Sequence, residues 1–167
     1  AYDVYTHTAH VVEALPGDLP LRLAALLHDI SKPAVFTQDE TGRGHFYGHA
    51  REGGKVADAV LVRLKAPNLL RSQVLYLVEN HMTPFEPDKK LLRRHIAKHG
   101  LDAAWQLLTL QRADHLAKGT DEDNSAYFDE IEQLLTEIRL EGSSITAKDL
   151  AINGEDILAL GLEPGPH

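Results

Sequence analysis

Apolar residues recur at intervals of three and four along most of this chain, and Pro or Gly interrupts the pattern repeatedly. Such spacing places apolar side chains along one face of an α-helix, and Pro and Gly end helices. We expect seven main helices, which begin near residues 4, 18, 49, 68, 88, 102 and 125. The third helix is expected to bury Val56, Val60 and Leu64, while Gly53 and Gly54 allow another backbone to approach closely.

Residues 35–47 have a different character, because two short runs rich in β-branched and aromatic residues flank a polar stretch that contains Gly42 and Gly44. This pattern predicts a short β-hairpin. After Gly142 the chain holds fewer apolar residues, with a short helix expected near residues 156–160. We therefore predict an all-α helical bundle with one small β-hairpin insertion. Residues 1–142 are expected to form this domain, and residues 143–167 a C-terminal tail packed on it.

The composition narrows the class of function. The 167 residues include 17 Lys and Arg against 25 Asp and Glu, a net charge of −8 that argues against global, non-specific binding to nucleic acid. No apolar run approaches the roughly 20 residues of a membrane span, and we expect a cytoplasmic protein without a membrane partner. Because there is no Cys, disulfides and thiolate zinc sites are excluded. The ten His residues favour nitrogen and oxygen ligands for a metal ion.

Three polar residues interrupt apolar helix faces. His7 lies between Val4 and Val11, His81 continues a face that carries Leu77, and Asp114 continues an apolar series along its helix. A hydrogen-bonded core imidazole explains either His alone, and a salt bridge would explain Asp114. A carboxylate on a core-facing stripe is costly unless it is paired or bound to a cation. The coincidence of all three residues favours a metal site.

The adjacent pair His28 and Asp29 ends an apolar helix shortly before Pro33 forces the chain to turn. Neighbouring side chains within a helix point about 100° apart, but a ligand placed against the last turn can meet both. We therefore place this pair at the mouth of the core.

The set of residues resembles the HD superfamily of metal-dependent phosphohydrolases, in which the ligand pattern is H…HD…D on consecutive helices. His7 matches the first histidine, His28 and Asp29 match the doublet, and Asp114 matches the last aspartate. His49 and His81 look like the additional histidines of members that hold two metal ions. The implied metal ligands are His7, His28, Asp29, His49, His81 and Asp114.

The resemblance also implies cofactors and a reaction. One or two divalent ions are expected, Mn, Fe, Ni, Co or Zn, with Mg possible at a site richer in oxygen ligands. Paired ions activate water for attack on phosphorus. Asp29, His28 and Lys32 are the implied catalytic residues, and Asp29 would bridge the two ions. A substrate phosphate is also expected to meet the basic residues Lys32, Arg93, Arg94 and Lys98. A solvated residue before Pro33 would equally explain Lys32, and a solvated helix face would explain the other three.

The sequence resembles even more closely the HD domain of bacterial CCA-adding tRNA nucleotidyltransferases, in the poly(A) polymerase family. The likeness runs from Tyr2 to His49, through residues 63–68 and into the tail. Ser31 stands where these proteins usually carry Gly. The paired acidic motif on strands that nucleotidyl transfer requires is missing, so we do not expect that reaction from this chain alone.

Three functions remain open at this point. The first is a phosphodiesterase or phosphatase that acts on nucleotides or on RNA 3′ ends. The second is a module that mainly positions tRNA, and the third is a metal-dependent oxygenase on the same scaffold. The oligomeric state is not indicated by the sequence.

Overall fold

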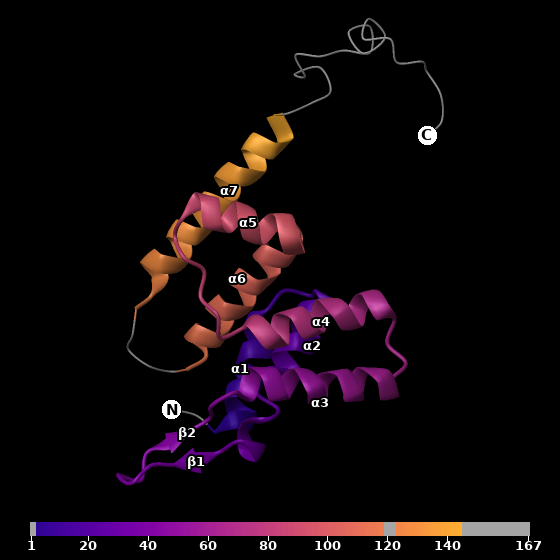
Figure 1. Cartoon of the computed structure of the whole chain (residues 1–167), viewed down its shortest axis with the longest axis vertical. Coiled ribbons are helices and arrows are strands. Elements are labelled where there is room, and N and C mark those ends of the chain that lie inside the picture. The colour runs from indigo at the N-terminus through magenta and orange to yellow at the C-terminus, as the bar shows by residue number, and fades with distance from the viewer. Residues whose placement is uncertain (1–2, 119–122, 145–167) are drawn as a thin grey trace, which may run out of the picture.

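A computed structural model describes residues 3–118 and 123–144 of the chain (Figure 1). This part is helical apart from one two-stranded hairpin, which confirms the predicted all-α class. The helices are α1 (Val4–Ala14), α2 (Leu19–Leu27), α3 (His49–Arg63), α4 (Asn68–Asn80), α5 (Lys89–His99), α6 (Leu101–Leu116) and α7 (Ser125–Ser144), with a 3-10 turn at Lys32–Ala34.

Aspartate side chains start three of the helices. The Oδ1 atoms of Asp3, Asp18 and Asp88 accept hydrogen bonds from the backbone N–H groups three residues later. Each bond satisfies a donor that the first helical turn leaves without a partner, which stabilises a helix by about 1 kcal/mol. Gly100, with a φ of 92°, separates α5 from α6. Because that conformation favours Gly, the two helices meet in a sharp corner.

Helix α2 lies at the centre of the lower part of the molecule in Figure 1, where it packs against α1, α4 and α6. Helices α5, α6 and α7 form the upper part, and α6 reaches down to the other group. The core between them is aliphatic, and its largest fully buried apolar side chains are Val11, Leu61, Val74, Leu77, Val78, Leu92, Leu107, Leu110, Ile131 and Leu135.

Helix α3 packs on α4 through small residues. Gly53, Gly54, Ala57 and Leu61 are its buried face, while Val56 is 40% exposed. A Cβ at Gly54 would lie 2.6 Å from the Glu79 carboxylate, so the close approach at Gly54 is made by a side chain of α4 and not by the expected backbone. The expected apolar face is wrong, because the small residues bring the two helices together and turn the larger ones outward. Leu64 in particular is 63% exposed.

The hairpin pairs β1 (Thr37–Gln38) with β2 (Gly44–His45) in antiparallel register, as expected. Asp39 organises its turn, since its Oδ1 accepts from the backbone N–H groups of Thr41 and Arg43. The expected short helix near residues 156–160, and all of the tail beyond Ser144, lie outside the described residues. Among the helices that are described, none is both long and apolar enough to cross a membrane.

Candidate metal centre

Three helix ends converge on one buried point. His28 is the C-cap of α2, His81 is the C-cap of α4, and Asp114 lies in the last turn of α6. Helix C-termini carry a partial negative charge from their free carbonyl groups. Their convergence therefore favours a cation at this point. His7 comes from α1 and His49 is the first residue of α3, so five helices and, for Asp29, the turn after α2 supply the six predicted ligands.

All six side chains are buried, and Asp29 is only 1% exposed. Burying charged groups is costly unless opposite charges compensate them. Two carboxylates and four imidazoles concentrated inside an aliphatic core are the donor set that suits a divalent transition metal. The residues that the structure brings together are His7, His28, Asp29, His49, His81 and Asp114.

The first group surrounds one carboxylate oxygen of Asp29. His28 Nε2 lies 3.2 Å from Asp29 Oδ2 and 3.4 Å from Asp114 Oδ1, and His7 Nε2 lies 2.9 Å from the same Asp114 oxygen. Donor atoms that share an ion at about 2.1 Å are separated by roughly 3.0 Å in octahedral and 3.4 Å in tetrahedral geometry. The observed separations therefore fit a common ion.

The second group surrounds the other oxygen. Asp29 Oδ1 lies 3.5 Å from His49 Nε2 and 3.8 Å from His81 Nε2, and the two imidazole nitrogens are 3.2 Å apart. Asp29 thus directs Oδ2 toward one pair of histidines and Oδ1 toward another. This is the geometry of a carboxylate that can bridge two ions.

Backbone carbonyl groups fix the orientation of each imidazole. The Nδ1 atoms of His28, His49 and His81 lie 2.7, 2.8 and 2.7 Å from the carbonyl oxygens of the third residue before each of them. His7 Nδ1 lies 3.2 Å from the carbonyl of Ala117. A carbonyl accepts only from a protonated nitrogen, so each ring in its neutral form has its Nε2 lone pair directed away from the carbonyl and available to a metal.

Two of the polar atoms at this point are buried without a hydrogen-bond partner among the described residues: His28 Nε2 and Asp29 Oδ1. A buried atom left in this state costs roughly 1–3 kcal/mol. One of these atoms belongs to each group. A cation in each position would satisfy both, so the residues present fit a divalent metal.

The charges of the group shift the ionisation of its members. Burial lowers the pKa of His28, but the adjacent carboxylates of Asp114 and Asp29 outweigh burial and raise that pKa to about 9. Burial lowers the pKa of His81 to about 4. Burial raises the pKa of Asp114, but the neighbouring His28 and His7 outweigh it, so this pKa lies far below the ordinary value. A bound metal ion would take the place of the proton on His28.

Lysines stand at the edge of the centre. Lys32 Nζ donates to Asp29 Oδ2 over 2.6 Å, and its ammonium group lies 5.7 Å from the ring centre of Phe46. Lys118 Nζ is 3.3 Å from Asp114 Oδ2. Lys118 was not foreseen, although its position four residues after Asp114 on a helix was the available signal.

The predicted basic helix is α5, and its cations contact other parts of the chain than the six clustered residues. Arg93 forms an ion pair with Glu141 of α7. Arg94 and Lys98 line a separate cavity against the connector after α4. Of the predicted phosphate-binding residues, the structure therefore brings only Lys32 to the metal centre.

Residues 4–119 match the family described as "HD domain". The chain belongs to the HD domain family. Similar curated proteins include the A-adding tRNA nucleotidyltransferase of Deinococcus radiodurans, 32% identical over 176 residues, and the CC-adding tRNA nucleotidyltransferase of Thermus thermophilus, 34% identical over 152 residues. These matches cover 99% and 89% of this chain but only 40% and 33% of the relatives. This chain therefore spans less than half of the length of either relative. Membership of the HD domain family agrees with the clustering of His and Asp residues.

Proposed function

We propose that this chain is a metal-dependent phosphohydrolase that cleaves phosphate esters in nucleotides or at RNA ends. The observation that carries the proposal is the orientation of Asp29, whose two oxygens face two separate histidine pairs. Two-ion sites of this kind hold both the attacking and the leaving oxygen in phosphoryl transfer. The reaction then needs no protein nucleophile, in agreement with a chain that lacks Cys.

The residues would divide their roles as follows. His7, His28 and Asp114 would hold one ion together with Asp29, and His49 and His81 would hold the other, also together with Asp29. When bound, one or two ions of Mn, Fe, Ni, Co or Zn, or Mg, supply a Lewis acid and lower the pKa of a water molecule. The backbone carbonyl groups behind the four imidazoles keep Nε2 directed inward throughout.

Lys32 would bind the substrate. Its side chain is 23% exposed, so the ammonium group lies at the boundary between the buried carboxylate and solvent. With metal ions neutralising Asp29, the same ammonium group is available to a phosphate oxygen. A lysine is suited to this role as a mobile point charge.

The test is metal-dependent hydrolysis of 2′,3′-cyclic AMP and of 2′-AMP, with Mn, Co, Ni, Zn and Mg supplied singly. We expect wild-type activity with at least one metal and its loss in Asp29→Ala. Asp102→Ala is the control, since this exposed carboxylate lies in the first turn of α6. The proposal fails if the folded wild type hydrolyses neither compound, or if Asp29→Ala retains full activity.

A second candidate is a module that positions tRNA, with metal as a structural component. The similarity to A-adding and CC-adding tRNA nucleotidyltransferases favours it. It predicts tRNA binding that survives Asp29→Ala in a protein without hydrolytic activity. The complete set of ligands favours the hydrolase instead, because positioning RNA requires no bridging carboxylate.

A further inference from the structure

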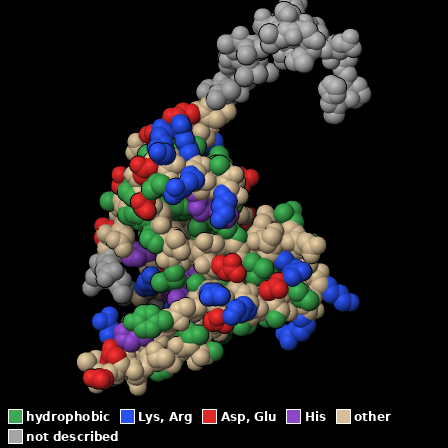
Figure 2. All heavy atoms as spheres, in the orientation of Figure 1, with side chains coloured by type: hydrophobic (Ala, Val, Ile, Leu, Met, Phe, Trp, Pro, Cys, Tyr) green, Lys and Arg blue, Asp and Glu red, His purple; other side chains and the backbone are tan. Residues whose placement is uncertain are grey.

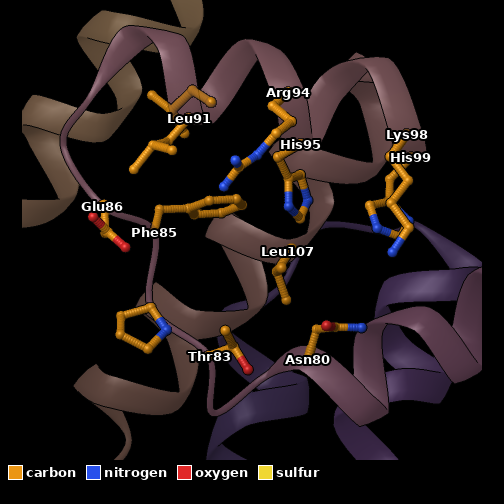
Figure 3. Close-up of a pocket in the computed structure, with 12 residues that line it drawn as sticks. Asn80, Thr83, Phe85, Glu86, Leu91, Arg94, His95, Lys98, His99 and Leu107 are labelled. Carbon is orange, nitrogen blue, oxygen red and sulfur yellow. The ribbon is translucent and has the colours of Figure 1, made fainter.

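A cavity of about 450 Å³ lies between α5 and the connector that follows α4 (Figure 3). Phe85 extends into it from the connector and Arg94 extends into it from α5, and the imidazole of His95 forms part of its wall. Leu91 and Leu107 line its apolar part. This volume is within the range of roughly 300–1,000 Å³ for small-molecule sites.

Two cations, Arg94 and Lys98, line this cavity. Arg94 and Lys98 are one helical turn apart on α5 and both are exposed. Among the described residues, neither lies within ion-pair distance of a carboxylate, although Glu86 lines the cavity on the connector side. Figure 2 shows basic and histidine side chains gathered over α5. Unpaired like charges on one concave surface of an acidic chain indicate an anionic ligand.

The other basic face of α5 provides a contrast within the same helix. Lys89 Nζ lies 2.8 Å from Glu137 and 2.7 Å from Glu141, and Arg93 also pairs with Glu141. Helix α7 therefore neutralises one basic face of α5 and leaves the other to the cavity. Ion pairs with α7 account for the first set of cations, but they do not explain a cavity beside the second.

Aromatic rings complete the wall. The His95 ring lies edge-on to Phe85 at 5.0 Å between centroids and 4.8 Å from the His99 ring. His95 Nε2 is 2.6 Å from the hydroxyl of Tyr76, and burial raises the pKa of Tyr76 to about 12. The phenol therefore keeps its proton and can donate to Nε2, which leaves the proton of a neutral His95 on Nδ1. Imidazole and phenyl surfaces are suited to a sugar or a base.

We propose that this cavity binds the phosphate group of a nucleotide, either free or within an RNA chain, through Arg94 and Lys98. Arginine offers a planar pair of N–H donors to phosphate oxygens, and lysine adds a point charge. The ligand phosphate lies on the α5 side, away from Glu86. The site is separate from the metal centre and binds without metal.

The end of α4 connects the two places. Asn80 lines the cavity, and the next residue, His81, belongs to the metal centre. A nucleotide chain held in the cavity would have its neighbouring phosphates beside the reaction site. This last relation rests on the proposed hydrolase function, whereas phosphate binding itself does not.

The test measures binding with all metals chelated by EDTA, so that it is independent of hydrolysis. The probes are AMP, a short single-stranded RNA oligonucleotide and adenosine, which lacks phosphate. The variant is Arg94→Ala/Lys98→Ala. The matched control is Lys89→Ala/Lys90→Ala, which removes the same charge from the same helix but not from the cavity.

We expect the cavity variant to lose about tenfold or more in affinity for a phosphate probe, while the control remains within a few-fold of wild type. Loss for AMP and RNA alike identifies a mononucleotide site, and loss for RNA alone identifies a site for the chain. The proposal is overturned if wild type binds neither phosphate probe, if adenosine binds as well as AMP, or if the two variants behave alike. Hydrolysis that Asp29→Ala abolishes would leave the proposed function intact in each of these cases.

Discussion

The hydroxyl of Ser31 donates a hydrogen bond to the backbone carbonyl of His49 over 2.6 Å. Ser31 is buried in the turn after α2, and His49 is the first residue of α3. The φ of Ser31 is −92°, which any residue adopts, so the turn does not require the Gly that is usual in similar proteins. The hydroxyl instead connects the turn that carries Asp29 to the helix that carries His49.

We predict that Ser31→Ala lowers the free energy of unfolding by about 1 kcal/mol, because a buried hydrogen bond is lost. The same change should weaken metal binding at the His49 and His81 pair. Denaturant unfolding of the metal-free protein and metal titration measure the two effects. Ser72→Ala serves as the control, since its hydroxyl donates to Leu69 on an exposed helix surface. Equal free energies of unfolding of the two variants would show that the buried Ser31 hydrogen bond stabilises the fold no more than the exposed Ser72 bond.

Lys32→Ala should separate substrate binding from metal binding. In the metal-free protein the ammonium group of Lys32 binds Asp29 Oδ2, and a metal ion at this oxygen would have to displace it. Its removal should therefore strengthen metal binding while kcat/KM for a phosphate ester falls by about tenfold or more. Lys55→Ala, on an exposed pair with Glu52, is the control. Weaker metal binding in Lys32→Ala would argue instead that the lysine supports the site.

Metal binding at neutral pH should release about one proton per protein. His28, with its pKa raised to about 9, is protonated in the metal-free protein, whereas His81, with its pKa of about 4, is already neutral. Titration calorimetry in buffers of different ionisation enthalpy measures this number. The released proton should disappear as the pH rises above 9. Binding at pH 7 without proton release would contradict the assigned state of His28.

The raised pKa of His28 also predicts how the stability of the metal-free protein depends on pH. A pKa above the unfolded value of 6.5 gives stability that is complete below pH 6.5 and is lost as the pH rises through about 9. Saturating metal should remove this dependence, because the proton is no longer bound. Urea unfolding between pH 6 and 10, with and without metal, distinguishes the cases. A flat metal-free profile in this range would refute the prediction.

Removal of metal should destabilise the wild type but not a variant that lacks a ligand. An ion present at about 1,000 times its Kd stabilises the native state by about 4 kcal/mol. We therefore expect EDTA to lower the Tm of wild type and of Asp102→Ala, and to leave Asp114→Ala unchanged. Both aspartates lie on α6, so the pair controls for helix effects. Equal responses of the two variants would place the stabilising ion elsewhere.

The sequence alone indicated much of the candidate site, because the residues that cluster there break local patterns. His7 and Asp114 are polar residues on apolar helix faces, and His28 ends an apolar run. Such interruptions of a helical pattern can be recognised from the sequence without knowledge of the tertiary structure. The pairing of Asp29 with two separate histidine groups was implied by the family resemblance, and the structure shows the orientation that permits it.

Other features depend on contacts between distant segments. The division of α5 into a paired face and a cavity face requires Glu137 and Glu141 to lie beside Lys89, which only the packing of α7 determines. The exposed Val56 shows the same limit, since Gly53 and Gly54 pack against α4 in place of the larger residues. Helical periodicity favours large apolar residues for the buried face, whereas close helix packing selects small ones.

The most direct test of the central claim is anomalous diffraction from crystals of wild type soaked in Mn²⁺. We expect an ion within about 2.0–2.4 Å of Asp29 Oδ2, His28 Nε2 and Asp114 Oδ1, with any second ion between Asp29 Oδ1, His49 and His81. Asp29→Ala crystals treated in the same way should lack these peaks. Manganese bound away from Asp29, or no ordered ion at saturating Mn²⁺, would contradict the claim that this carboxylate organises a metal centre.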